Sequence, residues 1–263
     1  RQSTIGHDNL ETLNAKFSLA KVLTQRGKLT DATLFFRAVV ASYEVKFEAN
    51  DYRILDAKDE LAAVLTSIGK FEEAEELHRH TLAMRKETAG DYDSKTLKTM
   101  RALALLLSKP ELEVNQQPKI KEAESLLRTT LERQTHALGP SHPDTLFTMT
   151  KLTELLIRQR QQRLDEAYSM CHRVVKLCRT SLGAHHPQTQ KCLQHLATVL
   201  EYQEKFDEAE KVRRDATTAT LIRDKNDNVF ASLKEKIASA TTQQKKYWKG
   251  CVEVIEANDA QRG

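Results

Sequence analysis

Apolar positions return along the chain with a long period rather than in one continuous amphipathic pattern. Five alanines follow an acidic residue, at Asp31-Ala32, Glu73-Ala74, Glu122-Ala123, Glu166-Ala167 and Glu208-Ala209. A leucine followed by a small residue precedes each of them, at Leu19-Ala20, Leu61-Ala62, Leu103-Ala104, Leu152-Thr153 and Leu196-Ala197. The alanines are 42, 49, 44 and 42 residues apart, and self-similarity at such a period indicates stacked helical hairpins.

Each copy is predicted to form two helices joined by a turn. Seven residues before the leucine lies Thr12, Ile54, Thr96, Thr145 or Thr189, so this spacing is constant in all five copies. The leucine-to-alanine distance is 13 in three copies but 20 in the third and 15 in the fourth. The extra residues therefore fall between the helices, and the prolines of the third insert, Pro110 and Pro118, predict a loop there.

The second helix of each copy is predicted to bury residues three and eight positions after its alanine. These residues are Phe35 and Val40, Leu77 and Leu82, Leu126 and Leu131, and Met170 and Val175. Gly90, Gly139 and Gly183 lie sixteen residues after an alanine, where a glycine ends a helix. Pro143 and Pro187 are expected in the first turn of the helix that follows.

Three stretches carry a resemblance to a known family. Gly-Lys-Phe-Glu-Glu-Ala-Glu runs from Gly69 to Glu75, and Leu-Gly-x-x-His-Pro-x-Thr runs from Leu138 to Thr145, with a related copy from Leu182 to Thr189. At this spacing they resemble the tetratricopeptide repeats of kinesin light chains and nephrocystin-like proteins, over about Asp8 to Asp227. The resemblance implies an all-α fold, a right-handed α-solenoid of five tetratricopeptide-like helical hairpins plus a C-terminal capping helix.

The predicted domain organisation follows from these repeats. Residues 1–227 hold five of them, at about 8–49, 50–91, 92–140, 141–184 and 185–227. In residues 228–263, apolar residues such as Phe230, Leu233 and Ile237 recur at helical spacing. A terminal repeat needs its apolar face covered, so this segment is predicted to be a capping helix and tail.

Composition limits the class of protein. The chain has 41 Lys plus Arg and 37 Asp plus Glu, and a net charge of +4 is too small an excess to indicate nucleic-acid binding. With only 8 Gly and 5 Pro in 263 residues, helix is favoured throughout. No run of about 18 apolar residues predicts a membrane span. The start at Arg1, without a signal-type apolar core, indicates a segment of a longer product.

The four cysteines, Cys171, Cys178, Cys192 and Cys251, form no Cys-x-x-Cys pair. Cys171 and Cys178 lie seven residues apart on one predicted helix, hence about 10 Å apart, beyond the reach of a disulfide. The protein is therefore expected in a reducing compartment, namely the cytoplasm, where it could associate with the cytoskeleton.

No catalytic, cofactor-binding or metal-ligating residue is predicted. Gly27-Lys28-Leu29-Thr30 lacks the upstream glycine and strand of a phosphate-binding loop and is interpreted as a turn. His78 and His80 diverge by about 200° on a helix, and Glu75 with His78 lacks the second copy that a di-iron site needs. These side chains are expected on solvated helix faces. Because no Ser-His-Asp or Cys-His arrangement can be argued either, the chain is predicted not to be an enzyme and to need no cofactor.

The resemblance implies that a partner binds in a concave groove lined by the first helix of each repeat. The groove positions lie −5, −2, +2, +5 and +6 residues from the leucine. The candidate partner-binding residues at these positions are Phe17, Lys21, Asp59, Lys98, Arg101, Lys109, Phe147, Thr150, Arg158, Lys191, Gln194 and Tyr202. In kinesin light chains the −2 residue is often an asparagine that holds an extended cargo peptide, whereas no asparagine occupies it here.

The charge of this predicted groove suggests its ligand. Lys98, Arg101 and Lys109 form a basic cluster, which favours an acidic or phosphorylated segment held by an arginine fork. Asp56 and Asp59 favour a partner of alternating charge, and aromatic residues such as Phe17 offer apolar anchors.

Three functions remain open from the sequence. The first is an adaptor or scaffold module that binds an extended or helical segment of another protein in the concave groove. The second is a structural subunit of a large multiprotein assembly, which uses the convex surface, the third-repeat insert and the termini. The third is a regulatory domain attached to an enzyme or a nucleotide switch. In each case the expected partner is a protein or peptide, without nucleic acid or membrane insertion, and the oligomeric state is left open.

Overall fold

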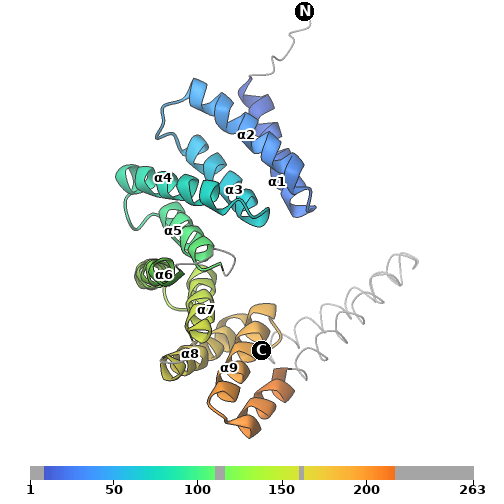
Figure 1. The fold of residues 1–263 in the computed structure, drawn as a ribbon, viewed down its shortest axis with the longest axis vertical. Coiled ribbons are helices and arrows are strands. Elements are labelled where there is room, and N and C mark those ends of the chain that lie inside the picture. Colours follow the sequence, from blue (N-terminus) through green and yellow to red (C-terminus); the bar gives the residue numbers. More distant parts are fainter. Residues whose placement is uncertain (1–8, 110–115, 160–162, 217–263) are drawn as a thin grey trace, which may run out of the picture. The chain divides into compact units, whose positions relative to one another are not determined.

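The computed structural model describes residues 9–109, 116–159 and 163–216, and every regular element among them is an α-helix (Figure 1). The helices are α1 (Leu10–Gln25), α2 (Leu29–Lys46), α3 (Tyr52–Ser67), α4 (Phe71–Ala89), α5 (Ser94–Leu107), α6 (Gln116–Leu138), α7 (Pro143–Arg158), α8 (Leu164–Leu182) and α9 (Pro187–Tyr202). Residues 206–216 are also helical. Consecutive helices form hairpins, which confirms the predicted all-α class.

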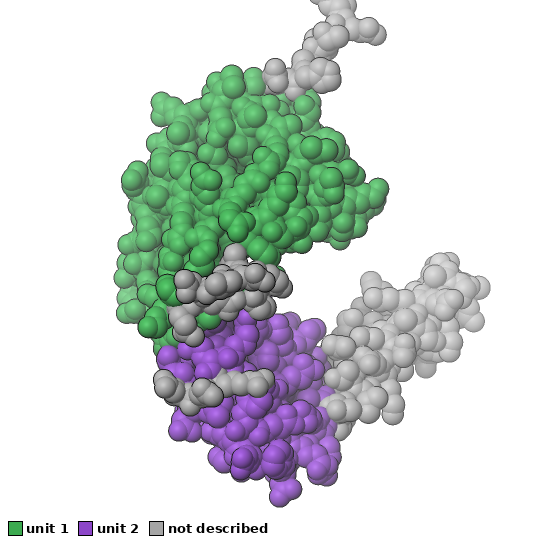
Figure 2. Space-filling view, in the orientation of Figure 1, with its two compact units in different colours: residues 1–137 green, residues 138–263 purple. Residues whose placement is uncertain are grey.

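The chain divides into two compact units, residues 1–137 and residues 138–263 (Figure 2). In unit 1, α1, α3 and α5 lie next to one another as the first helices of their hairpins, and α2 and α4 pack between them. In unit 2, α8 packs against α7 and α9, which also contact each other. The sequence did not predict this division.

Small residues of the repeat pattern are fully buried. Ala20, Ala32, Ala62 and Ala74 have no exposed surface, as their predicted packing role requires. Without a large side chain at these positions, the helix backbones approach closely. Leu19 differs from the other leucine anchors and is 44% exposed, because no described helix precedes α1.

The buried stripe of the second helices is shifted from the predicted one. The most deeply buried side chains lie four, seven and eleven residues after the repeat alanine, whereas those at +3 are only partly buried. The +4 residues are Phe36, His78, Leu127 and Cys171, and the +11 residues are Tyr43, Arg85, Gln134 and Cys178. Steps of four, seven and eleven follow one face of a helix of 3.6 residues per turn, so the +3 prediction is corrected to +4.

The helix ends agree with the sequence signals. Gly90 and Gly183 cap α4 and α8 with φ of 85° and 88°, a backbone conformation that glycine adopts without strain. Pro143 and Pro187 are the first residues of α7 and α9. Pro118 lies in the first turn of α6 rather than in a loop, and a first-turn proline sacrifices no helical hydrogen bond.

Two predictions concern residues outside the described ranges, namely the third-repeat insert at 110–115 and the capping helix at 228–263. Among the helices that are described, none combines the length and the apolar character that a bilayer crossing requires.

Candidate functional site

The candidate partner-binding residues occupy the first helices of the hairpins, or the residues directly after them. In unit 1 they are Phe17 and Lys21 on α1, Asp59 on α3, Lys98 and Arg101 on α5, and Lys109 just beyond it. In unit 2 they are Phe147, Thr150 and Arg158 on α7, and Lys191, Gln194 and Tyr202 on α9. The structure therefore presents two candidate surfaces, one per unit.

The unit 1 surface carries more positive than negative side chains at its centre. The ammonium nitrogens of Lys21 and Lys98 lie 3.5 and 3.9 Å from the same carboxylate oxygen of Glu60. These lysine side chains are 48% and 66% exposed, and they come from α1 and α5 on either side of α3. Because two ammonium groups share one carboxylate, the surface retains positive charge, to which Arg101 adds one helical turn beyond Lys98.

A hollow of about 260 Å³ opens between α1 and α3 on the same unit. Its lining residues are Leu10, Asn14, Phe17, Tyr43, Tyr52, Arg53 and Asp56. The Tyr43 hydroxyl donates to Asn14 Oδ1 at 2.9 Å, and the Phe17 ring packs edge-on against Phe36 with centroids 5.6 Å apart. The walls are thus fixed by internal contacts, and they combine aromatic surface with amide, guanidinium and carboxylate groups.

Arg53, on the wall of this hollow, is held in place twice. Its Nε and Nη2 donate to the two carboxylate oxygens of Asp51 at 2.9 and 2.7 Å. Its guanidinium carbon lies 3.5 Å from the centroid of the Phe47 ring. A bidentate ion pair and an aromatic stack restrict the arginine strongly, and the hydrogen bonds from Arg53 lower the pKa of Asp51.

Asp59 takes part in the packing of unit 1 rather than in its open surface, which corrects the expectation that it is a groove contact. Its carboxylate is 15% exposed and accepts from Arg85 Nη2 at 3.0 Å and from Thr99 Oγ1 at 2.7 Å. The Nδ1 atom of His78 lies 3.3 Å from it. Asp59, Arg85 and Thr99 thus join α3, α4 and α5, and we call this group the ionic junction.

Asp56 extends the ionic junction toward solvent. It accepts from Arg85 at 2.7 Å and from Lys95 at 2.6 Å. Partial burial raises the pKa of Asp56, but the hydrogen bonds from Arg85 and Lys95 outweigh it and hold the pKa below its usual value. Both candidate acidic residues of α3 therefore already have cationic partners within the protein.

The unit 2 surface also places two lysines around one carboxylate. Glu154 lies 3.0 Å from Lys151 and 2.8 Å from Lys191, with His195 Nε2 at 3.7 Å. Burial raises the pKa of Glu154, and the hydrogen bonds from the two lysines lower it further than burial raises it. The Lys151 ammonium lies 5.4 Å from the centroid of the exposed Phe147 ring, much as Lys21 lies 5.7 Å from that of Phe17.

Thr150 is not on the open surface of unit 2, which corrects its placement among the groove residues. It is 1% exposed, and its hydroxyl donates to the Leu146 carbonyl at 2.8 Å. The same oxygen accepts from Gln188 Nε2 at 2.8 Å and lies 3.4 Å from Cys192 Sγ. Thr150 therefore joins α7 to α9.

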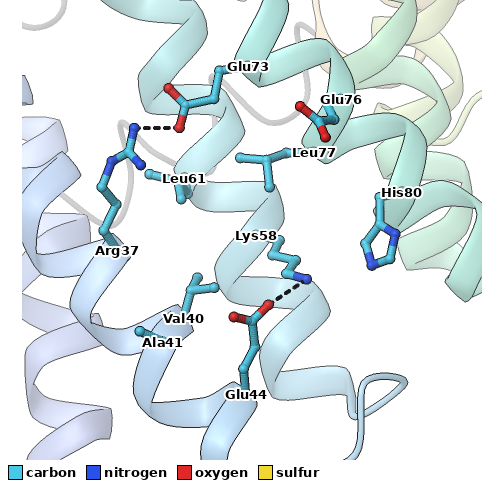
Figure 3. A pocket seen from close by; sticks show the side chains of 10 residues that line it. All are labelled: Arg37, Val40, Ala41, Glu44, Lys58, Leu61, Glu73, Glu76, Leu77 and His80. Carbon is cyan, nitrogen blue, oxygen red and sulfur yellow. Dashed lines mark hydrogen bonds and ion pairs between the residues drawn. The ribbon is translucent and has the colours of Figure 1, made fainter.

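A second hollow of unit 1, of about 610 Å³, lies between the second helices α2 and α4 with α3 beneath it (Figure 3). Ion pairs stand at two places on its wall, Arg37 with Glu73 and, at 2.8 Å, Lys58 with Glu44. Glu76 and His80 line it from α4. Sequence reasoning named none of these residues as a binding site, because they come from three different helices and follow no single repeat position.

The sequence raises His78 as a candidate metal ligand and Gly27 as part of a candidate phosphate-binding loop, and both lie in the described part of the chain. No group of three His, Cys, Asp or Glu side chains is placed to hold a metal ion within it. His78, expected on a solvated helix face, is instead 2% exposed beside Asp59, because it occupies the buried +4 position of α4. Gly27, with φ of 75°, stands in the short turn between α1 and α2.

Comparison with known proteins agrees with the repeat geometry. Family profiles described as tetratricopeptide repeat match residues 54–94, 116–144 and 156–220. A search of curated protein sequences finds no match.

Several solved structures share the fold. One of them is a Podosopora anserina protein described as a kinesin light chain with nearly identical TPR-like repeats, in a form with one substituted residue. It aligns with a TM-score of 0.70 at 20% identity, over 84% of this chain and 99% of that one. BtubC (BKLC) from P. vanneervenii aligns with a TM-score of 0.68 at 16% identity, over 81% and 82%. The MamA protein aligns with a TM-score of 0.53 at 14% identity, over 82% and 95%. At these identities the likeness concerns the fold.

Proposed function

The chain belongs to the tetratricopeptide-repeat family, and from this premise we propose that it is a non-catalytic adaptor module that binds a segment of another protein. Repeats of this kind stack helical hairpins into extended binding surfaces. The proposed contact in unit 1 is the open face of α1, α3 and α5, which holds Phe17, Lys21, Lys98 and Arg101.

The observation that carries the proposal is the hollow between α1 and α3 together with the lysines beside it. The hollow offers aromatic walls from Phe17, Tyr43 and Tyr52 for one apolar side chain. Phe17 also lies beneath the Lys21 ammonium, so the hollow and the positive charge are adjacent on α1. A segment with an apolar residue followed by acidic or phosphorylated residues matches both features.

Charge supports an acidic partner over a basic one. Asp56 and Asp59 already have cationic partners in the ionic junction, and Glu60 is shared by two lysines. The carboxylates of α3 are therefore neutralised from within the protein. Opposite charge on the partner would steer its approach and select against basic segments.

The unit 2 surface supports the same mode of binding with its own residues. Phe147 and Lys191 are exposed, and Glu154 is again held by two lysines. The described cysteines of this unit, Cys171, Cys178 and Cys192, are free thiols, in keeping with the reducing compartment that we propose for the protein.

The test is selection of binding sequences from a displayed library of random short peptides. We expect enriched peptides to combine an aromatic or large aliphatic residue with acidic residues. Their affinity should fall by about tenfold or more in the Lys98→Glu/Arg101→Glu variant, because an attractive charge pair becomes a repulsive one. Binding is measured by fluorescence anisotropy at two salt concentrations.

Arg173→Glu/Lys176→Glu is the matched control. Both residues are exposed on the second helix α8, are three residues apart like Lys98 and Arg101, and undergo the same change of charge. Circular dichroism establishes that both variants remain equally helical. Enrichment of basic peptides, or equal loss of binding in the control, would contradict the proposal.

The hollow between α2 and α4 favours a second candidate, a structural subunit that packs through its convex side. Glu76→Lys changes the charge of this hollow at an exposed residue. If Glu76→Lys abolishes binding of the selected partner and Lys98→Glu/Arg101→Glu does not, the convex surface replaces the concave one.

A further inference from the structure

Two thiols face each other between the last helices of unit 2. Cys178 lies in the last two turns of α8 and Cys192 in the first two turns of α9. Their Sγ atoms are 3.9 Å apart, and the residues are 0% and 2% exposed. Both are free in this structure.

The repeat geometry, rather than one chance side-chain orientation, brings them together. Cys178 occupies the +11 position of its second helix, and Cys192 lies four residues before the leucine anchor of the next first helix. In unit 1 the equivalent residues are Arg85 and Thr99, which meet on the carboxylate of Asp59. The same two positions therefore converge in both units, and in unit 2 each of them holds a thiol.

We propose that Cys178 and Cys192 form a reversible disulfide when the protein meets a peroxide. A disulfide needs sulfurs about 2.05 Å apart, so the two atoms have to approach by roughly 1.9 Å. Rotation about the Cα–Cβ bonds is the movement that brings two facing sulfurs together.

The reaction balances in two steps. The Cys192 thiolate attacks one oxygen of the peroxide, an S–O bond forms, the O–O bond breaks, and hydroxide leaves. The Cys178 thiol gives its proton to this hydroxide, and its sulfur attacks the sulfenic sulfur of Cys192. The S–S bond forms, the S–O bond breaks, and a second hydroxide leaves and takes up the proton that Cys192 released. In total, two thiols lose two electrons and two protons, and hydrogen peroxide is reduced to two molecules of water.

The two sulfurs share a hydrogen bond that couples their protonation. The hydrogen bond between Cys178 and Cys192 lowers the pKa of Cys192. Burial opposes this shift, and the Thr150 hydroxyl and the Lys191 ammonium support it. The same hydrogen bond, together with burial, raises the pKa of Cys178. The same disulfide forms whichever of the two sulfurs attacks the peroxide first.

Cys171 is excluded as a partner of Cys178, whereas it lines the same internal space as Cys192, so a bond between Cys171 and Cys192 is the competing product. Cys171 lies seven residues before Cys178 on α8, close to two helical turns away, which exceeds the span of a disulfide. Burial raises the pKa of the Cys171 thiol to about 12, and the pKa of Cys178 is raised as well, so distance and not acidity separates these two thiols.

The experiment treats the full chain with hydrogen peroxide, blocks remaining thiols and maps disulfides by tryptic mass spectrometry. Trypsin cuts between the two cysteines, so the proposed bond links the peptide Leu177–Arg179 to the peptide Cys192–Lys205. We expect this pair, about 2 Da lighter than the sum of its two reduced peptides, as the dominant product, and its loss after dithiothreitol. Cys251→Ser is examined in parallel to remove the cysteine outside the described residues.

Denatured protein oxidised in guanidinium chloride provides the control. In an unfolded chain the shortest loop closes most readily, which favours Cys171 with Cys178 over Cys178 with Cys192. Reversal of this preference in the folded protein supports the proposal. The proposal is overturned if the folded protein links Cys171 or Cys251 instead, or if peroxide yields sulfinic acid on Cys192 without a linked pair.

Discussion

In each unit, the end of the second helix of one hairpin packs against the first helix of the following hairpin. At this contact both helices meet the residue that lies two positions before a leucine anchor. In unit 1 this is the ionic junction of Asp59, Arg85 and Thr99. In unit 2 the equivalent residues are Thr150, Cys178 and Cys192, which we call the thiol junction. The helices converge in the same way, yet one junction is held by full charges and the other by a hydroxyl and two thiols.

The difference shows that the repeat geometry determines which positions contact each other, whereas the residue types at those positions can differ. A buried arginine has to keep its carboxylates, because an unpaired buried charge is costly. A buried thiol behaves as a small apolar group and makes no such demand. The ionic junction is therefore expected to be intolerant of single substitutions, and the thiol junction is free to acquire redox chemistry.

The largest expected effect comes from Arg85→Met in the ionic junction. The substitution keeps most of the side-chain volume but leaves Asp59 and Asp56 without the guanidinium that they share. We expect a loss of about 3–5 kcal/mol in the free energy of unfolding of unit 1. Urea denaturation measures the loss, and hydrogen exchange followed by mass spectrometry locates it to α3, α4 and α5.

A double variant separates the charge effect from a packing effect. If charge is the cause, Arg85→Met/Asp59→Asn recovers part of the stability, because one uncompensated carboxylate is removed along with its partner. A loss below about 1 kcal/mol in Arg85→Met alone would contradict the view that the junction depends on its charges.

A smaller effect is expected from the equivalent change in unit 2. Cys178→Ala removes one buried sulfur and leaves no unpaired charge, so we expect a loss of about 1 kcal/mol. The same urea titration compares it directly with Arg85→Met. A loss as large as that of Arg85→Met would show that the thiol contact contributes more than packing.

The repeat spacing was sufficient to predict the helical hairpins, because the small residues that allow close approach recur with the period of the fold. Ala32, Ala74, Ala123, Ala167 and Ala209 were identified in this way, and all are buried. The two-unit division was not predictable from the sequence, since no change of composition marks residue 137.

The candidate site was predicted less completely than the fold. Carrying the groove positions over from the family assumed that every −2 side chain faces the partner. Asp59 and Thr150 instead accept hydrogen bonds from residues of neighbouring helices. A single sequence does not reveal that Arg85, eleven residues after its repeat alanine, is the partner of Asp59. The buried +11 arginine was nonetheless a usable signal, because a charge in an apolar stripe requires a partner.

Acid is expected to weaken the ionic junction in a defined pH range. The pKa of Asp56 is lower in the folded protein than in the unfolded chain, where it is about 3.9. Its contribution to stability is therefore complete above the unfolded pKa and is lost as pH falls through the folded pKa. Urea denaturation at pH values from 5 to 2 is expected to show this loss, reduced in Asp56→Asn. Equal slopes in both proteins would contradict the assignment.

The smallest effect belongs to unit 2 and occurs at a higher pH. Burial lowers the pKa of His195 below its unfolded value of about 6.5, although the nearby Glu154 opposes this. The unfolded state then binds more protons, so stability is complete above pH 6.5 and declines as pH falls from there through the folded pKa. Its buried Nδ1 has no hydrogen-bond partner among the described residues, in keeping with a neutral ring. Hydrogen exchange in α7 and α9, corrected for intrinsic rates, should reveal the decline between pH 7.5 and 5.5. His195→Gln should abolish it, and the same decline in that variant would place its origin elsewhere.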